Sequence, residues 1–178
     1  MVPIKRILCP VDLSETQHPA LDVACDIAAF FAAELRILNV VAPVPVLSVP
    51  PTPTATFDVS AYQKDLTRSA CKFLKCLPEK QVSEEVKIIR EVETGEPAER
   101  IVALADEQGV DLIVITTHGR KGLKHLVFGS VAEKVIRTAN CPVLALKRSL
   151  DDEGMSQDKG GEDASQSRAY ASKSRGAS

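Results

Sequence analysis

Five short runs of mainly aliphatic residues alternate with stretches of helical periodicity, and this alternation leaves few possible folds. The runs cover residues 4–12, 35–42, 85–93, 110–117 and 141–147. Strands that alternate with helices form βαβ units, in which the strands are parallel, the crossovers are right-handed and helices cover both faces of the sheet. The sequence therefore predicts an α/β fold with a five-stranded, mostly parallel sheet.

Four stretches between or beside these runs carry the signals of helix ends. The first and the fourth have capping-box spacing, at Ser14–Gln17 and at Ser130–Glu133. The second is expected over residues 59–77 and ends at Pro78. The third has Pro97 in its first turn and Gly109 just past its end.

Two segments do not follow this pattern. Residues 42–57 hold five of the eleven prolines, which excludes a helix or a ladder-forming strand. This segment follows the second strand as either a surface excursion or a lid. From residue 149 onward the sequence is polar and has no apolar periodicity. We therefore expect one domain over residues 1–148 and a disordered polar tail over 149–178.

Composition and charge exclude several classes of protein. A net charge of −2 and 4% aromatic residues provide neither the basic surface nor the stacking side chains of a nucleic-acid-binding protein. No apolar run approaches the roughly 18 residues of a membrane span, and the N-terminus lacks the features of a secretory signal. The five cysteines are odd in number and form no C-x-x-C pair, which favours reduced thiols in the core of a cytoplasmic protein.

The stretch ITTHGRKGLKHLVFGSVAEKVIR, residues 115–137, interrupts an apolar strand with glycines and basic residues before a helix begins. Glycines allow close approach of the backbone to an anion, and a helix N-terminus favours phosphate. The same residues also suit a simple turn and a helix cap, and their spacing alone does not decide between the two roles. The stretch is neither a Walker A loop nor the G-x-G-x-x-G dinucleotide fingerprint.

Asp12 is a second candidate, because it follows the first strand at its C-terminal end. A carboxylate there can accept hydrogen bonds from ribose hydroxyls or hold a divalent cation that bridges phosphates. It can also serve only to stabilise the N-terminus of the next helix. His118 lies near the same region, but we find no nucleophile–base pair or metal-ligand spacing around it.

Taken together, ILCPVDLSE, the G-x-P at 95–97, DLIVITTHGRKGL, GSVAEKVIR and CPVLALK resemble the universal stress protein family over residues 3–148. The chain is most similar to the ATP-binding branch of that family. The resemblance implies a Rossmann-like sheet of strand order 3-2-1-4-5, and a homodimer in which the last strand, 143–147, pairs with its two-fold mate. It also implies binding of ATP or AMP with Mg²⁺ or Mn²⁺, and at most slow ATP hydrolysis.

The resemblance assigns a nucleotide site residue by residue. The phosphate motif of the branch is G-x-x-G, nine residues, then G-[ST], and Gly119 and Gly129-Ser130 match it in register. Thr116 stands at the first glycine of the motif, and Val11 stands where the branch often has Thr. Asp12 matches the residue near ribose and the metal, which it would hold weakly or indirectly. The implied nucleotide-binding residues are Pro10, Val11, Asp12, Val40, Val41, Thr116, Gly119, Arg120, Gly122, Gly129, Ser130 and Val131.

The sequence thus predicts a cytoplasmic stress-response protein that binds an adenine nucleotide as a homodimer, with room for an unidentified protein partner. The alternative is a nucleotide-free dimeric interaction module of the same fold. A hydrolytic or adenylating enzyme on this fold has the least support, because fold does not fix function.

Overall fold

The computed structural model describes residues 3–13, 18–45, 58–77, 86–117 and 129–147, which all belong to the unit Met1–Arg148. The predicted tail, 149–178, lies outside the described residues, and so does most of the proline-rich segment. The elements are β1 (Arg6–Pro10), α1 (Pro19–Phe31), β2 (Glu34–Val41), α2 (Val59–Cys76), β3 (Ile88–Thr94), α3 (Pro97–Gln108), β4 (Leu112–Thr117), α4 (Ser130–Thr138) and β5 (Val143–Lys147).

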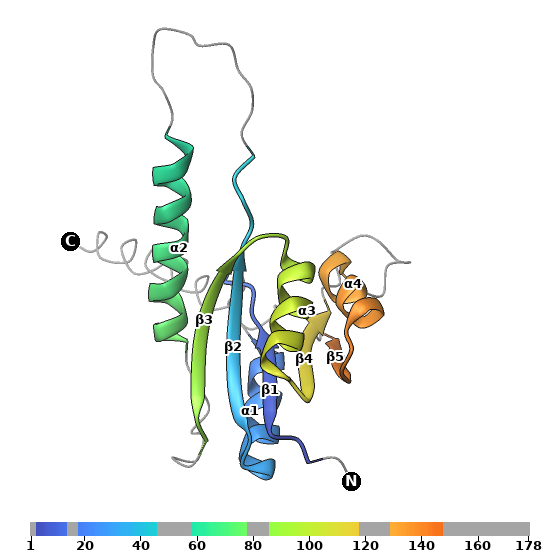
Figure 1. The fold of residues 1–178 in the computed structure, drawn as a ribbon. Helices are drawn as coiled ribbons and strands as arrows, with labels where there is room; N and C mark the ends of the chain where they lie inside the picture. Colours follow the sequence, from blue (N-terminus) through green and yellow to red (C-terminus); the bar gives the residue numbers. More distant parts are fainter. Residues whose placement is uncertain (1–2, 14–17, 46–57, 78–85, 118–128, 148–178) are drawn as a thin grey trace, which may run out of the picture. The chain divides into compact units, whose positions relative to one another are not determined.

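The five strands form one parallel sheet in the order β3-β2-β1-β4-β5, which confirms the predicted fold (Figure 1). Helices α1 and α2 pack on one face, and α3 and α4 pack on the other. From β1 the chain moves toward the β3 edge, and from β4 it moves toward the β5 edge. The order therefore reverses between β1 and β4, where open α/β sheets bind ligands beyond the carboxyl ends of the strands.

The central strands are covered on both faces, as their continuous apolar runs predict. Leu8 in β1 and Ile113 and Val114 in β4 are completely buried. The prediction that every cysteine lies in the core is wrong for Cys71 and Cys76, which are exposed on α2. These two residues lie about 100° and 200° around the helix axis from the nearest buried residues before them, so they point away from the sheet.

Two helices have N-caps that differ from the prediction, although α4 begins at Ser130 as predicted. Helix α1 begins at Pro19 with His18 as its N-cap, and not at the predicted capping box, whose residues 14–17 lie outside the described part of the chain. Proline in the first turn marks the start instead, because its fixed φ suits that position. Helix α4 has Gly129 as its N-cap and Ser130 as its first residue, and no side chain caps it. Ser130 is thus one position too late to form the predicted capping box.

Helices α2 and α3 have side-chain caps and match the prediction. Asp58 accepts a hydrogen bond from the Ala61 N–H at 2.9 Å, and Glu96 accepts one from the Glu99 N–H at 3.0 Å. Helix α3 ends before Gly109, which takes the left-handed conformation at φ 59°.

The two edges of the sheet are chemically unlike. Edge strand β3 carries charged side chains at Arg90, Glu91 and Glu93. Edge strand β5 has four apolar residues before Lys147, and all four are only partly buried. Charged residues on an edge strand oppose pairing with another chain, whereas an apolar edge permits it.

Candidate functional site

Nine of the twelve residues predicted to bind nucleotide are described, and they belong to the carboxyl ends of three strands and the start of one helix. Pro10 is the last residue of β1, and Val11 and Asp12 follow it. Val40 and Val41 end β2, Thr116 lies in β4, Gly129 is the N-cap of α4, and Ser130 and Val131 are its first residues. The ends of parallel strands meet at one edge of the sheet. Gly119, Arg120 and Gly122 lie outside the described residues.

The residue after β1 is fixed by two hydrogen bonds. The Val11 N–H donates to the Leu38 carbonyl at 2.8 Å, and the Val11 carbonyl accepts from Asn39 Nδ2 at 2.9 Å. Val11 is 7% exposed and Asn39 is 8% exposed, so both bonds are shielded from water. The next residue, Asp12, is exposed at the edge of the sheet. Sequence reasoning missed Asn39, although it is the polar residue within the apolar run ILNVV, residues 37–41.

The end of β2 extends past the end of β1. The last pair between the two strands is Pro10 with Leu38. Because N–H and C=O groups alternate sides along a strand, those of Val40 face the same way as those of Leu38, toward β1. The Val41 carbonyl faces β3, where it accepts from the Gly95 N–H at 3.1 Å. The main-chain groups of half-buried Val40 therefore point into the space beyond Pro10.

Thr116 adopts a regular strand conformation, paired with Leu146 of β5. No positive φ is required there, so a β-branched residue fits the backbone without strain. Its neighbour Thr117, which sequence reasoning did not single out, is buried and donates its hydroxyl to the Leu146 carbonyl at 3.2 Å. This bond joins the carboxyl ends of β4 and β5.

Helix α4 presents an N-terminus without a side-chain cap, unlike α2 and α3. Gly129 is extended, at φ −70° and ψ 153°. Lys134, one turn further on, contacts Glu99 at 2.9 Å and Glu96 at 3.5 Å, which joins α4 to the start of α3. The hydrogen bond to Glu99 raises the pKa of Lys134, and both carboxylates contribute charge to the same effect.

The described part of the chain contains no group of three or more His, Cys, Asp or Glu residues that could hold a metal ion. Asp12 is the one carboxylate among the predicted site residues. A single carboxylate suits a cation that keeps several waters and is held mainly by nucleotide phosphates. No helix in the described ranges has both the length and the apolar character needed to cross a membrane.

Comparison with known proteins places these features in a family. Residues 3–147 match the model of the universal stress protein family. The chain belongs to the universal stress protein family. Universal stress protein MJ0531 of Methanocaldococcus jannaschii is 37% identical over 144 residues, which cover 81% of this chain and 82% of that protein. YxiE of Bacillus subtilis is 32% identical over 80% of this chain and 98% of its own length.

Solved structures of the family share the fold. A universal stress family protein from Burkholderia pseudomallei is 28% identical, with a TM-score of 0.61 and coverage of 82% and 98% of the two chains. A universal stress protein solved in complex with cAMP is 24% identical, with a TM-score of 0.55 and coverage of 83% and 99%. One from Archaeoglobus fulgidus, solved with dAMP, is 22% identical, with a TM-score of 0.51 and coverage of 82% and 100%. At the last two identities the likeness concerns the fold.

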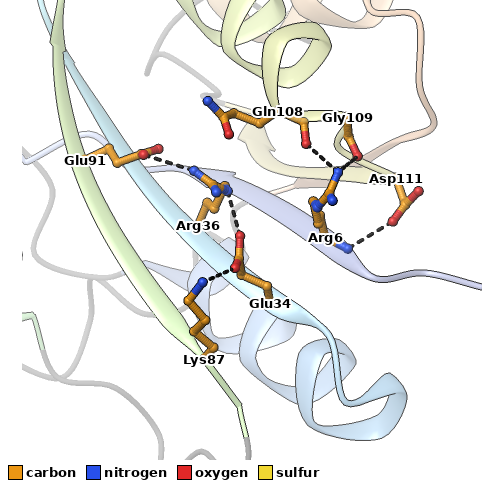
Figure 2. Close-up of polar contacts among 8 residues, drawn as sticks. All are labelled: Arg6, Glu34, Arg36, Lys87, Glu91, Gln108, Gly109 and Asp111. Atoms are coloured by element: carbon orange, nitrogen blue, oxygen red, sulfur yellow. Dashed lines mark hydrogen bonds and ion pairs between the residues drawn. The ribbon is translucent and has the colours of Figure 1, made fainter.

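The opposite edge of the sheet in this universal stress protein holds a network of charged side chains (Figure 2). Arg36 donates to Glu34 at 2.8 Å and to Glu91 at 3.0 Å, and Lys87 donates to Glu34 at 2.8 Å. Arg6 donates to the Gln108 carbonyl at the end of α3. An open cavity of about 540 Å³ lies between these groups. The contacts among Glu34, Arg36, Lys87 and Glu91 join β2 to β3, and Arg6 joins β1 to the end of α3 through a separate contact.

This network predicts a specific loss of stability in acid. The hydrogen bond from Lys87, followed by the charge of Arg36, lowers the pKa of Glu34 below its ordinary value of 4.5. Because the pKa of Glu34 is lower in the folded state than in the unfolded state, ionised Glu34 stabilises the fold. This stabilisation is complete above pH 4.5 and is lost as the pH falls through the folded-state pKa. We expect urea unfolding of Lys87→Met to show a shallower loss of stability in acid than the wild type. If the free energy of unfolding falls equally steeply in acid for the two proteins, Lys87 is not what lowers the pKa of Glu34.

Proposed function

We propose that this universal stress protein binds an adenine nucleotide, ATP or AMP, at the carboxyl edge of β1, β2 and β4, and acts in the cytoplasm as a homodimer. The observation that carries the proposal is the orientation of Val40. Its N–H and C=O lie side by side beyond the last pair of β1 and β2. Adenine offers an acceptor at N1 beside a donor at N6, so one residue's main chain can bind both atoms.

The phosphates would then lie at the start of α4. The first-turn N–H groups of a helix carry partial positive charge and favour phosphate, and here no side chain caps them. Gly129 adds no side chain in front of these donors, and the main-chain N–H of Val131 lies within the first turn. We include Gly119, Arg120 and Gly122 in the same proposed phosphate-binding site.

Asp12 would face the ribose and a nucleotide-borne Mg²⁺ or Mn²⁺. Its place after β1 and its exposure support this role. The cation would neutralise phosphate charge when bound, and Asp12 would contact it directly or through water. The proposal includes no catalytic residue and at most slow ATP hydrolysis. The neighbours of the same fold solved with cAMP and dAMP support an adenine nucleotide as the ligand class.

Calorimetric titration of the purified protein with ATP, in the presence of Mg²⁺, tests the proposal. We expect saturable binding, and we expect GTP to bind at least about tenfold more weakly, because its 6-oxo group reverses the hydrogen-bonding pattern of the base. Absence of saturation up to about 1 mM ATP, a free energy near −4 kcal/mol, would favour the nucleotide-free interaction module instead.

Thr116 allows a second test of the site. Replacement by glycine removes a β-branched side chain from the position of the first motif glycine, and we expect ATP affinity to rise about fivefold. Stability should fall by about 0.5–1 kcal/mol, because glycine weakens a strand. Thr116→Val keeps the bulk and removes the hydroxyl. If ATP affinity falls in both variants, the hydroxyl binds the nucleotide and the crowding argument is wrong.

The dimer proposal rests on the free edge of β5. The Ile113 N–H donates to the Pro142 carbonyl at 3.0 Å, so alternation turns the N–H of Ala145 away from β4. Ala145→Pro removes that outward donor and leaves the β4–β5 ladder intact. We expect sedimentation velocity to show a folded monomer for this variant and a dimer for the wild type. A dimer that survives the substitution would place the interface elsewhere.

A further inference from the structure

Asn39 is one of two buried polar residues in the described part of the chain. Its Nδ2 donates to the Val11 carbonyl at 2.9 Å. Asn39 is in β2, and Val11 directly follows β1. The two residues are 28 positions apart in the sequence, so the contact depends on the pairing of β1 with β2.

The register of the two strands identifies the bond that is missing. In a parallel ladder, a residue donates to one residue of its neighbour and accepts from the residue two positions further on. Val11 donates to Leu38, so its carbonyl would next accept from the N–H of Val40. The paired residues end instead at Pro10 with Leu38, and the Val11 carbonyl accepts from the side chain of Asn39.

We propose that Asn39 is a positioning residue that ends the β1–β2 ladder one bond early and so keeps the Val40 main chain available to a ligand. The Asn39 amide satisfies the buried Val11 carbonyl, so this acceptor does not take up the Val40 N–H. The N–H of Val40 then has no strand partner on the side that faces the site. This proposal rests on the proposed function for the identity of the ligand, a 6-aminopurine, and adds the residue that sets its selectivity.

The experiment compares the wild type with Asn39→Leu, which keeps a similar volume without the donor, and Asn39→His, which keeps an N–H donor. The first readout is hydrogen exchange of the Val40 amide by NMR, without nucleotide. In the wild type we expect this amide to exchange at least about tenfold faster than that of Leu38, because only the latter lies inside the ladder. In Asn39→Leu the Val40 amide should become protected, because it can pair with the Val11 carbonyl.

The second readout is the ratio of affinities for ATP and ITP, whose base has a 6-oxo group. The wild-type ratio should fall about fivefold or more in Asn39→Leu, the effect of one hydrogen bond, and Asn39→His should restore it. Equal loss of affinity for both nucleotides, with unchanged Val40 exchange, would overturn the proposal and leave Asn39 a purely structural role. A wild-type Val40 amide as protected as that of Leu38 would overturn it even if Asn39→Leu fails to fold.

The two proposals fail separately. If the wild type binds no adenine nucleotide, the proposed function is wrong, whereas the exchange of the Val40 amide still decides whether Asn39 ends the ladder. If ATP binds but its preference over ITP does not depend on Asn39, the nucleotide site stands and the positioning role is wrong.

Discussion

Replacement of Gly129 by valine is expected to weaken ATP binding by at least about 100-fold, near 2.7 kcal/mol, while the protein remains folded. The backbone at Gly129 is extended, at φ −70° and ψ 153°, which valine adopts readily. The branched side chain would stand in front of the first N–H groups of α4, where we place the phosphates. The cost in helix stability should be on the order of 1 kcal/mol, because valine is a poor N-cap residue. Calorimetry measures the affinity, and thermal unfolding checks the fold.

A matched control separates this effect from a general loss of stability. Asp58→Ala removes the side-chain cap of α2, whose bond to the Ala61 N–H is 2.9 Å long. It should cost about 1 kcal/mol of stability and leave ATP affinity unchanged. If folded Gly129→Val binds ATP as tightly as the wild type, the start of α4 does not bind the phosphates. The proposed contact between the base and the Val40 main chain would be unaffected.

The second large effect is expected at Arg36, in the charged network of Figure 2. Its side chain is 12% exposed and pairs with Glu34 and Glu91, which are 17% and 28% exposed. The second oxygen of Glu91 is buried and has no hydrogen-bond partner in the described structure, so the carboxylate depends on Arg36. Arg36→Leu should lower the free energy of unfolding by about 3 kcal/mol, because it leaves a poorly solvated negative charge unpaired. Urea unfolding measures the loss.

Two further variants test the cause of that loss. Addition of Glu91→Leu to Arg36→Leu removes the stranded charge, so the double variant should recover at least about half of the stability. Arg68→Leu breaks an ion pair with Asp65 that is about 70% exposed on both sides, and it should change stability by no more than about 0.5 kcal/mol. A loss at Arg68 as large as at Arg36 would show that burial is not the cause.

The sequence predicts the sheet well because its strands are apolar runs whose character depends little on distant partners. The helix starts were harder, because a capping box is one of several competing local signals. Pro19 sets the start of α1 and Gly129 caps α4, and both override a serine with the right spacing. Cysteine is usually buried, but at Cys71 and Cys76 the rotation of α2 decides exposure.

The ends of the strands predict where site residues lie, since a parallel sheet gathers its carboxyl ends. Contacts across the sheet could not be predicted in the same way. The bond from Asn39 to Val11 spans 28 positions, and the pair between Arg36 and Glu91 spans 55. Each depends on strand order and register together, and a local pattern contains neither.

The unlike edges of the sheet limit how many copies can associate. If both edges could accept a strand, each added copy would present a new acceptor, and the assembly would grow as an open-ended filament. With charged residues along β3 and apolar residues along β5, each copy has one sheet edge suited to pairing with another strand. In the dimer that we propose, two copies related by a two-fold axis pair through β5 and leave no further strand edge for a third copy. Raising the protein concentration should therefore convert monomer to dimer and produce no series of larger species.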